Sequence, residues 1–257
     1  MKFKATPLRL ASEMLSQGPI GVFRILFGEK RLSLLNQAQV IQALISHYSL
    51  VRWADGETAL ARGKSIGYQK KSRELADKLN SIFEIEKNRL LIGIPPANFE
   101  SIFNGKWNLS RIRIMFSTRV YLSNRISVKS RSRFVSTFFW YEVYADLPIL
   151  LNQIKQGRPC LLVTGNLDFL KVCPKGTEIL ETDSKDAFDN HELVEKKIDK
   201  WIENSGNEYP TLRPLILLAC GPFSKVLAHK YANHAQMVDV GHGFNFYLAG
   251  KPKYAWE

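Results

Sequence analysis

Residues 48–57 read YSLVRWADGE, an apolar run that ends in two carboxylates separated by one glycine. A short run of this composition is typical of a strand that is buried on both faces of a parallel sheet. Directly after it, Asp55 and Glu57 flank Gly56, which allows a sharp bend. Carboxylates spaced in this way can bind a hard cation such as Mg²⁺ or Mn²⁺. We therefore expect a strand that delivers a divalent-metal site to the edge of a sheet.

Short apolar runs recur along the chain, and each is followed by glycine, proline or polar residues. These runs predict strands over residues 50–53, 89–94, 159–164, 177–180, 214–220 and 236–240. Helices are predicted between them over residues 37–46, 72–83, 136–156, 187–204 and 223–232. The alternation predicts an α/β, Rossmann-like fold, a mostly parallel sheet with helices on both faces. Pro148 is expected to kink or divide the third helix.

Length and composition narrow the class of protein. The 257 residues, 45% of them hydrophobic, suit one large domain with a sizeable core. Three isolated cysteines without C-x-x-C spacing argue against a zinc or disulfide framework and favour a reducing cytoplasm. We expect neither a secretory signal nor a spanning helix, which needs about 18 apolar residues. The net charge of +12 indicates acidic partners: nucleic acid, anionic membrane or phosphorylated substrates.

Two segments carry unusual charge. Residues 1–36 mix apolar side chains with six basic residues and only two glutamates. They predict a basic amphipathic arm, which either lies on an anionic membrane or packs on a single domain formed by residues 37–257. Residues 101–141 hold eight basic residues and no Asp or Glu. This zone can bind a diphosphate, an anionic lipid or nucleic acid, or it can be a solvated surface without a ligand.

Four short motifs gain meaning from their combination. They are RWADGE at 52–57, GKSIGYQ at 63–69, the GP turn at 221–222 and DVGH at 239–242. Together they resemble motifs of the bacterial glycosyltransferases of the GT-D fold, a family first described as a domain of unknown function. A helix reading LADKL and a strand ending in GIP, which that family also has, lie between them. Asp-Gly-Glu alone occurs by chance in many proteins, whereas the combination is specific.

The resemblance implies a metal-dependent glycosyltransferase of the hexosyl-transfer type. It would move a sugar from a nucleotide-sugar to a glycan acceptor that is linked to a lipid or a protein. A UDP-sugar is the first candidate for the donor. The implied setting is the biosynthesis of bacterial surface polysaccharide or glycoprotein. The enzyme would be cytoplasmic, with peripheral contact to the inner face of the membrane if the basic arm binds anionic lipid.

The resemblance also assigns roles to residues at the rim, beyond the carboxyl ends of the strands, where such sheets bind ligands. Asp55 and Glu57 are the expected ligands of Mn²⁺ or Mg²⁺, which would stabilise the charge on the leaving diphosphate. These two residues and His242 are the candidate catalytic residues. Contacts to the nucleotide-sugar are expected from Arg52, Gly56, Lys64, Ser65, Gln69, Gly221 and Pro222.

The chain departs from the family in three places. Ala54 replaces the glycine before the first carboxylate. After His242 the chain reads GFNFY, without the acidic residues that usually follow in the family. Where the family has a glycine-rich stretch that contains asparagine, this chain has only the residues GNLD at 165–168. The catalytic base, and with it the choice between inversion and retention, is therefore left open.

Two other readings stay open. The first is a nucleic-acid-binding protein that uses the basic zone 101–141, although no nucleic-acid module is visible. The second is a degenerate family member that binds a nucleotide without turnover, which the missing acids suggest. A dinucleotide-dependent oxidoreductase is unsupported, since no G-x-G-x-x-G follows any predicted strand.

Overall fold

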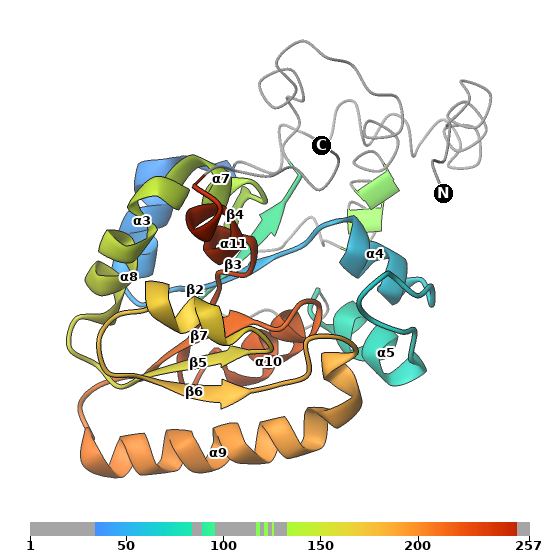
Figure 1. Cartoon of the computed structure of the whole chain (residues 1–257). Coiled ribbons are helices and arrows are strands. Elements are labelled where there is room, and N and C mark those ends of the chain that lie inside the picture. The colour runs from blue at the N-terminus through green and yellow to red at the C-terminus, as the bar shows by residue number, and fades with distance from the viewer. Residues whose placement is uncertain are drawn as a thin grey trace.

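The structure is a computed structural model, and it describes residues 34–83, 89–95, 117–118, 121–122, 125 and 133–250. One eight-stranded, all-parallel sheet runs through it in the order β1-β4-β3-β2-β8-β7-β5-β6 (Figure 1). The strands are β1 (Leu34–Leu35), β2 (Ser49–Arg52), β3 (Leu90–Ile94), β4 (Arg133–Ser136), β5 (Cys160–Thr164), β6 (Thr177–Glu181), β7 (Leu215–Ala219) and β8 (Gln236–Asp239).

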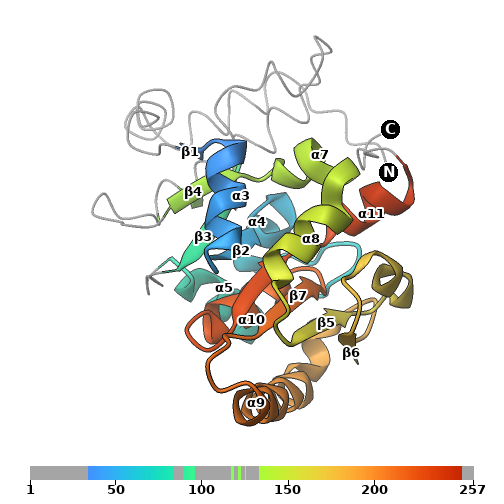
Figure 2. The same cartoon turned by 90° about the vertical axis from the view of Figure 1, so that its left-hand side faces the viewer.

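Helices cover both faces of this sheet (Figures 1 and 2). One face carries α4 (Asp55–Ala61), α5 (Arg73–Ser81), α9 (His191–Glu208) and α10 (Phe223–Tyr231). The other carries α3 (Gln37–Ile45), α7 (Phe139–Val143), α8 (Leu147–Lys155) and α11 (His242–Leu248). Short 3₁₀ helices are η3 (Tyr144–Asp146), η4 (Leu167–Val172) and η5 (Ala187–Asn190). The predicted α/β, Rossmann-like fold is thereby confirmed.

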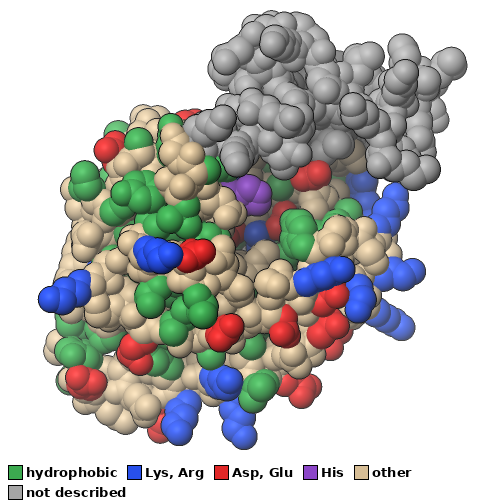
Figure 3. All heavy atoms as spheres, in the orientation of Figure 1, with side chains coloured by type: hydrophobic (Ala, Val, Ile, Leu, Met, Phe, Trp, Pro, Cys, Tyr) green, Lys and Arg blue, Asp and Glu red, His purple; other side chains and the backbone are tan. Residues whose placement is uncertain are grey.

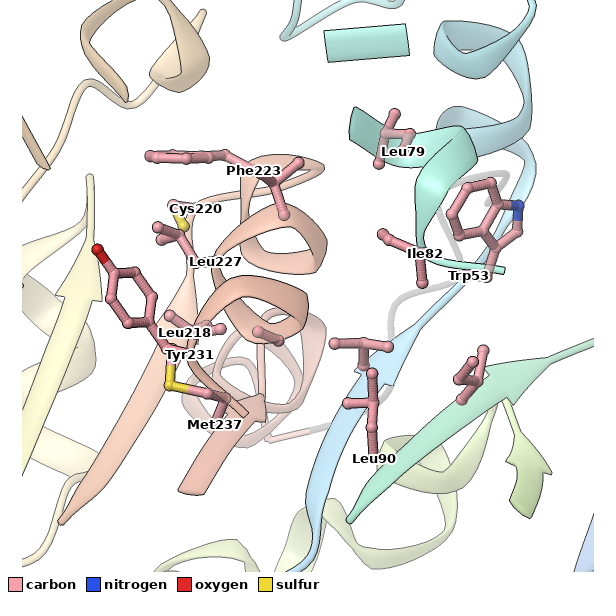
Figure 4. Close-up of a cluster of buried hydrophobic side chains, with 14 of the residues drawn as sticks. Trp53, Leu79, Ile82, Leu90, Leu218, Cys220, Phe223, Leu227, Tyr231 and Met237 are labelled. Carbon is pink, nitrogen blue, oxygen red and sulfur yellow. The ribbon is translucent and has the colours of Figure 1, made fainter. Parts of the chain in front are cut away.

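The strands are apolar because their side chains enter two hydrophobic cores, one on each face of the sheet. Successive residues of a strand point to opposite faces, so Leu50 and Val51 of β2, both fully buried, enter different cores. Figure 4 shows the core beneath α5 and α10, in which Leu227 of α10 and Leu218 and Met237 of the strands belong to one hydrophobic cluster. Burying one such side chain stabilises the fold by about 1.5–3 kcal/mol.

The predicted strands and the helices over 37–46, 72–83 and 223–232 are confirmed with small shifts of their ends. The predicted division of the helix over 136–156 is also confirmed, because the chain forms α7, η3 and α8 there. Pro148 lies in the first turn of α8, where its missing N–H breaks no helical hydrogen bond. The strands β1 and β4 and the helices α4 and α11 were not predicted, since each is short.

Some predictions fall on residues outside the described part. The arm 1–36 is described only from Leu34, where β1 pairs with β4 and Asn36 caps α3. These residues belong to the sheet domain rather than to a separate arm. Most of the basic zone 101–141 also lies outside the described residues. No helix of the described chain combines the length and apolar character needed to cross a membrane.

The sheet changes winding between its two central strands. β2 and β8 are neighbours, and β2 leads into α4 on one face whereas β8 leads into α11 on the other. At such a point the connections diverge and leave a crevice beyond the carboxyl ends of the strands, which is where ligands bind in open α/β sheets. The topology therefore directs attention to Arg52, Asp55 and His242.

Candidate functional site

A buried cluster of charges lies beyond the ends of β2 and β8. The Lys225 Nζ of α10 lies 2.8 Å from Glu57 Oε1 and 2.9 Å from Asp239 Oδ2. The three side chains are 3%, 6% and 3% exposed, respectively. Asp239 Oδ2 also accepts a hydrogen bond from the backbone N–H of Arg52, at 3.3 Å. One lysine ammonium thus pairs with both buried carboxylates, one from α4 and one from β8.

Within this cluster, Glu57 and Lys225 favour each other's charged form. Burial alone would raise the pKa of Glu57, but the adjacent Lys225 ammonium holds that pKa below its ordinary value. Burial likewise opposes the charge on Lys225, but the carboxylates of Asp239 and Glu57 raise its pKa above the ordinary value. The contact between Glu57 and Lys225 is therefore an ion pair between full charges inside the protein.

Glu57 is positioned by the start of α4. Ala54 precedes this helix and has no side-chain oxygen that could cap it. Glu57 Oε2 instead accepts a hydrogen bond from the Ala54 backbone N–H at 2.9 Å. Carboxylates in the first turn of a helix also interact favourably with its free N–H groups. Both oxygens of Glu57 are consequently engaged, one by Lys225 and one by the backbone.

Asp55, the other predicted metal ligand, lies at the rim with an exposed side chain. The surrounding protein, and then the negative charge of Glu57, raise its pKa above the ordinary value. No basic side chain of the described part forms an ion pair with it. Within those same residues, no group of three His, Cys, Asp or Glu side chains could hold a metal ion. Of the predicted pair, only Asp55 has its carboxylate open to a ligand.

Arg52 and His242 form the other side of the crevice. Arg52 is 9% exposed, and its Nη2 lies 3.0 Å from His242 Nδ1. Its Nε is buried and has no hydrogen-bond partner among the described residues. The protein around the ring keeps part of it from water, and this effect, followed by the positive charges of Arg52 and Lys225, lowers the pKa of His242 to about 3, so the ring is neutral. An unsatisfied guanidinium donor and a neutral imidazole thus meet beside the central strands.

Tyr68 connects this cluster to a neighbouring pocket. A Cβ atom on Gly56 would lie 3.1 Å from the Tyr68 hydroxyl oxygen, and one on Gly221 would lie 3.3 Å from its Cε2. Gly221 also has a φ of +61°, which favours glycine. These two glycines, predicted as substrate contacts, therefore make room for the Tyr68 ring. Burial and the carboxylate of Glu57 raise the pKa of Tyr68, so its hydroxyl stays protonated.

The pocket has a volume of about 260 Å³ and lies at the ends of β5, β6 and β7. Tyr68, Asn166, Phe169 and Asp183 contribute to its lining. Gly165 shapes its wall, because a Cβ there would lie 2.5 Å from the Ser184 Cα. The space-filling view shows acidic, basic and histidine side chains gathered in a hollow of one molecular face, beside hydrophobic side chains (Figure 3). A concave polar surface therefore adjoins the charged cluster.

The other residues that were predicted to contact the nucleotide-sugar lie outside the charged cluster. Gln69 is buried; its side-chain oxygen accepts from the Phe188 backbone N–H, and its amide donates to the Lys70 carbonyl. Lys64 and Ser65 are exposed in the loop after α4, where Ser65 Oγ accepts from the Lys71 backbone. No described contact joins either of them to the charged cluster. Pro222 lines the pocket, directly before α10.

Sequence reasoning misses Lys225 and the part played by Tyr68. The lysine that enters the cluster is Lys225 rather than Lys64, and it lies on a helix whose first turns are otherwise buried and mostly apolar. A charged residue in such a helix is the signal that could have identified it, since buried lysines are almost always paired. Tyr68 lies inside the GKSIGYQ motif, but only the fold brings it over Gly56 and Gly221.

Comparisons with known proteins agree with this architecture. The sequence profile of the family described as Glycosyltransferase GT-D fold matches residues 50–251. The chain is similar to a selenomethionine-substituted structure of the domain of unknown function 1792, with 22% identity and a TM-score of 0.65, over 90% of this chain and 86% of that one. It is also similar to a structure described as showing that this highly conserved domain has a distinct glycosyltransferase fold, with 20% identity and a TM-score of 0.62, over 91% and 86%.

A further similar structure is described as a new glycosyltransferase from Streptococcus sanguinis, with 21% identity and a TM-score of 0.58, over 86% of this chain and 87% of that one. No curated protein matches the chain. At such identities the solved structures establish the fold, whereas the profile match spans both sides of the crevice, from β2 to the end of α11. The chain therefore belongs to the GT-D family of glycosyltransferases, enzymes that transfer a sugar from a donor to a glycan acceptor.

Proposed function

We propose that this glycosyltransferase uses a nucleotide-sugar, in first place a UDP-sugar, and that the leaving diphosphate lies beside Arg52 and His242. The observation that carries the proposal is the buried Arg52 guanidinium, whose Nε has no acceptor in the described part of the chain. Buried donors are nearly always satisfied in native proteins, so an unsatisfied one suggests an acceptor that the substrate supplies. A phosphate oxygen suits a guanidinium, because the two form charge-assisted hydrogen bonds.

The neighbouring pocket offers room for the nucleoside. Its volume of about 260 Å³ is slightly below the roughly 300–1,000 Å³ of pockets that hold whole small molecules. It therefore suits a part of the donor rather than all of it. Phe169 and Tyr68 offer aromatic rings, and Asn166 and Asp183 offer polar groups, for a base and a ribose. Because Tyr68 reaches from the pocket toward the cluster, nucleoside and diphosphate would be continuous across it.

The charges of the cluster determine what a diphosphate would meet. Lys225, Glu57 and Asp239 carry one positive and two negative charges, and the neighbouring Arg52 supplies the second positive charge that balances them. As the glycosidic bond breaks, negative charge builds up on the diphosphate. Donors already fixed in place then stabilise the transition state without reorganising. Asp55 at the rim adds a negative charge that no described ion pair balances.

A divalent cation, Mn²⁺ or Mg²⁺, fits at Asp55 better than between Asp55 and Glu57. An open carboxylate and diphosphate oxygens are the hard ligands that such ions take. Glu57 is buried, and each of its oxygens already has a partner, Lys225 for one and the Ala54 backbone for the other. When bound, the ion would act as a Lewis acid on the diphosphate. We therefore propose Asp55 as the protein ligand, and we propose that Glu57 positions Lys225 and α4.

For the acceptor we propose a glycan of a bacterial surface polysaccharide or glycoprotein, linked to a lipid or a protein. The support is the family membership and the net charge of +12, which favours approach to anionic lipid at the inner face of the membrane. Binding to anionic vesicles, measured with and without residues 1–30, tests the membrane contact. Equal binding of the two forms would exclude the N-terminal arm as the membrane-binding element.

Calorimetry of UDP binding, with and without Mn²⁺, tests the donor site. We expect wild-type protein to bind UDP more tightly with Mn²⁺, and Asp55→Asn to lose that dependence. The matched control is Asp77→Asn on α5, an exposed carboxylate in a surface ion pair with Arg73. A panel of UDP-sugars, followed by UDP release, then identifies the donor.

Two outcomes would contradict the proposal. UDP binding with unchanged Mn²⁺ dependence in Asp55→Asn would remove Asp55 as a metal ligand. Failure of the wild type to bind UDP or any other nucleoside diphosphate would remove the diphosphate site itself. UDP binding without turnover of any nucleotide-sugar would instead favour the degenerate family member.

A further inference from the structure

The contact between Arg52 and His242 determines which nitrogen of the histidine carries the hydrogen. A guanidinium N–H can only donate a hydrogen bond. Because Arg52 Nη2 lies 3.0 Å from His242 Nδ1, this nitrogen must be the acceptor and hold a lone pair. A neutral imidazole has one N–H, which is then at Nε2. The histidine is therefore in the Nε2–H form, with its lone pair directed at Arg52.

We propose that Arg52 locks His242 in the Nε2–H tautomer, so that His242 donates a hydrogen bond to a diphosphate oxygen of the donor substrate and is not the base that deprotonates the acceptor. This inference rests on the proposed diphosphate site. It gives a definite role to a residue for which sequence reasoning predicts only a place in catalysis. The base is then a residue other than His242.

The charges around the ring support a neutral donor. Arg52 approaches from β2 and Lys225 from α10, and both disfavour an imidazolium. The carboxylate of Glu57, from α4, opposes them with a smaller effect. On α11 itself the neighbouring ring is Phe246, with centroids 5.8 Å apart and no charge. Protonation of His242 would also remove the lone pair that the buried Arg52 donor uses.

Arg52 takes the Nδ1 edge of the ring, which leaves Nε2 as the nitrogen that can contact a substrate. The two ring nitrogens lie on different edges of the imidazole. Nδ1 contacts the buried Arg52, whereas the side chain as a whole is exposed at the crevice. Arg52 has a further buried donor, Nε, without an acceptor among the described residues. The two residues together therefore offer donors and no acceptor, which suits an oxygen anion rather than the hydroxyl that a base must deprotonate.

The tautomer can be measured directly. We expect ¹⁵N spectra of the full chain with labelled histidine to show a protonated Nε2 and an unprotonated Nδ1 for His242, unchanged across the weakly acidic and neutral range. The spectrum of His242→Gln, which lacks this residue, assigns the signals. A protonated Nδ1, or a ring that titrates near neutral pH, would overturn the inference.

Two variants separate donor from base. In His242→Gln the side-chain amide reaches the position of Nε2 and still donates, whereas in His242→Asn the amide oxygen stays near Nδ1 and no donor reaches the outer edge. A hydrogen bond to a charged group is worth about 1.5–3 kcal/mol, so we expect His242→Asn to weaken UDP binding about 10- to 100-fold, and His242→Gln clearly less. Equal losses in both variants, with thermal unfolding unchanged, would contradict the donor role.

The pH dependence of kcat/KM gives an independent readout. If His242 were the base, its replacement by Gln would abolish the acidic limb of the profile. We expect that limb to be the same in wild type and in His242→Gln. If the wild type binds neither UDP nor inorganic pyrophosphate, the proposed function and the diphosphate contact fall together, while the ¹⁵N spectra still decide the tautomer.

Discussion

Two parts of the candidate site differ in how their charges are satisfied. In the inner cluster, Lys225, Glu57 and Asp239 are almost fully buried and paired with each other. At the rim, Asp55 and His242 are exposed. The difference teaches that a charge taken out of water must find its partner within the fold, because an unpaired one costs several kcal/mol. Groups that remain in contact with solvent do not need such a partner and can bind a substrate instead.

The largest effect should come from removing the shared cation. Lys225→Met leaves Glu57 and Asp239 buried without the cation that pairs with both, and we expect a loss of about 3–5 kcal/mol in the free energy of unfolding. Urea unfolding measures it. Lys230→Met is the control on the same helix, since its side chain is 45% exposed in a surface pair with Glu195. Surface pairs contribute about 0–1 kcal/mol. Equal losses in the two variants would therefore show that the buried ion pairs stabilise the fold no more than a surface pair does.

The pocket wall should be the next most sensitive part. A Cβ on Gly165 would collide with the Ser184 backbone, and we expect Gly165→Ala to cost about 1–3 kcal/mol and to weaken UDP binding. Gly206→Ala is the matched control, because nothing lies within 4 Å of a Cβ at that position in α9. In a helix this change should stabilise by about 0.5–1 kcal/mol. Unfolding and calorimetry check both variants, and a neutral Gly165→Ala would refute the close approach.

Acid pH should weaken the inner cluster more than the rim. The pKa of Glu57 is held below its ordinary value of 4.5, so the pair with Lys225 stabilises the folded state above that pH. This contribution is lost as the pH falls through the lowered pKa, when Glu57 takes up a proton. Since Lys225→Met lacks the pair, its deficit relative to wild type should shrink in acid. Urea unfolding of both proteins along a pH series measures this, and a constant deficit would contradict it.

The smallest effect on stability is expected at the rim. Asp55→Asn should change the free energy of unfolding by no more than about 0.5 kcal/mol, because an exposed side chain loses little when its charge is removed. Glu57→Gln should cost about 1–3 kcal/mol, since it weakens a buried charged hydrogen bond. Urea unfolding compares the two directly. The reverse order would place the structural carboxylate at Asp55 and undo the division between cluster and rim.

Much of the architecture could be predicted from local pattern. Apolar runs such as residues 214–220 identify buried parallel strands because both faces of such strands are covered. Strand ends rich in glycine and polar residues then mark one rim. Elements as short as β1 and α11 escape this reasoning, because a few residues carry too little periodicity.

By itself the sequence determined the parallel α/β fold, the edge at which the site lies, and the presence there of Arg52, Asp55 and His242. Only the tertiary structure decided how these groups are used. It pairs Glu57 with Lys225, places Tyr68 over Gly56, and turns Nδ1 of the histidine toward an arginine. The physical reason is that strand and helix patterns are local, whereas the partner of a buried charge comes from a distant part of the chain.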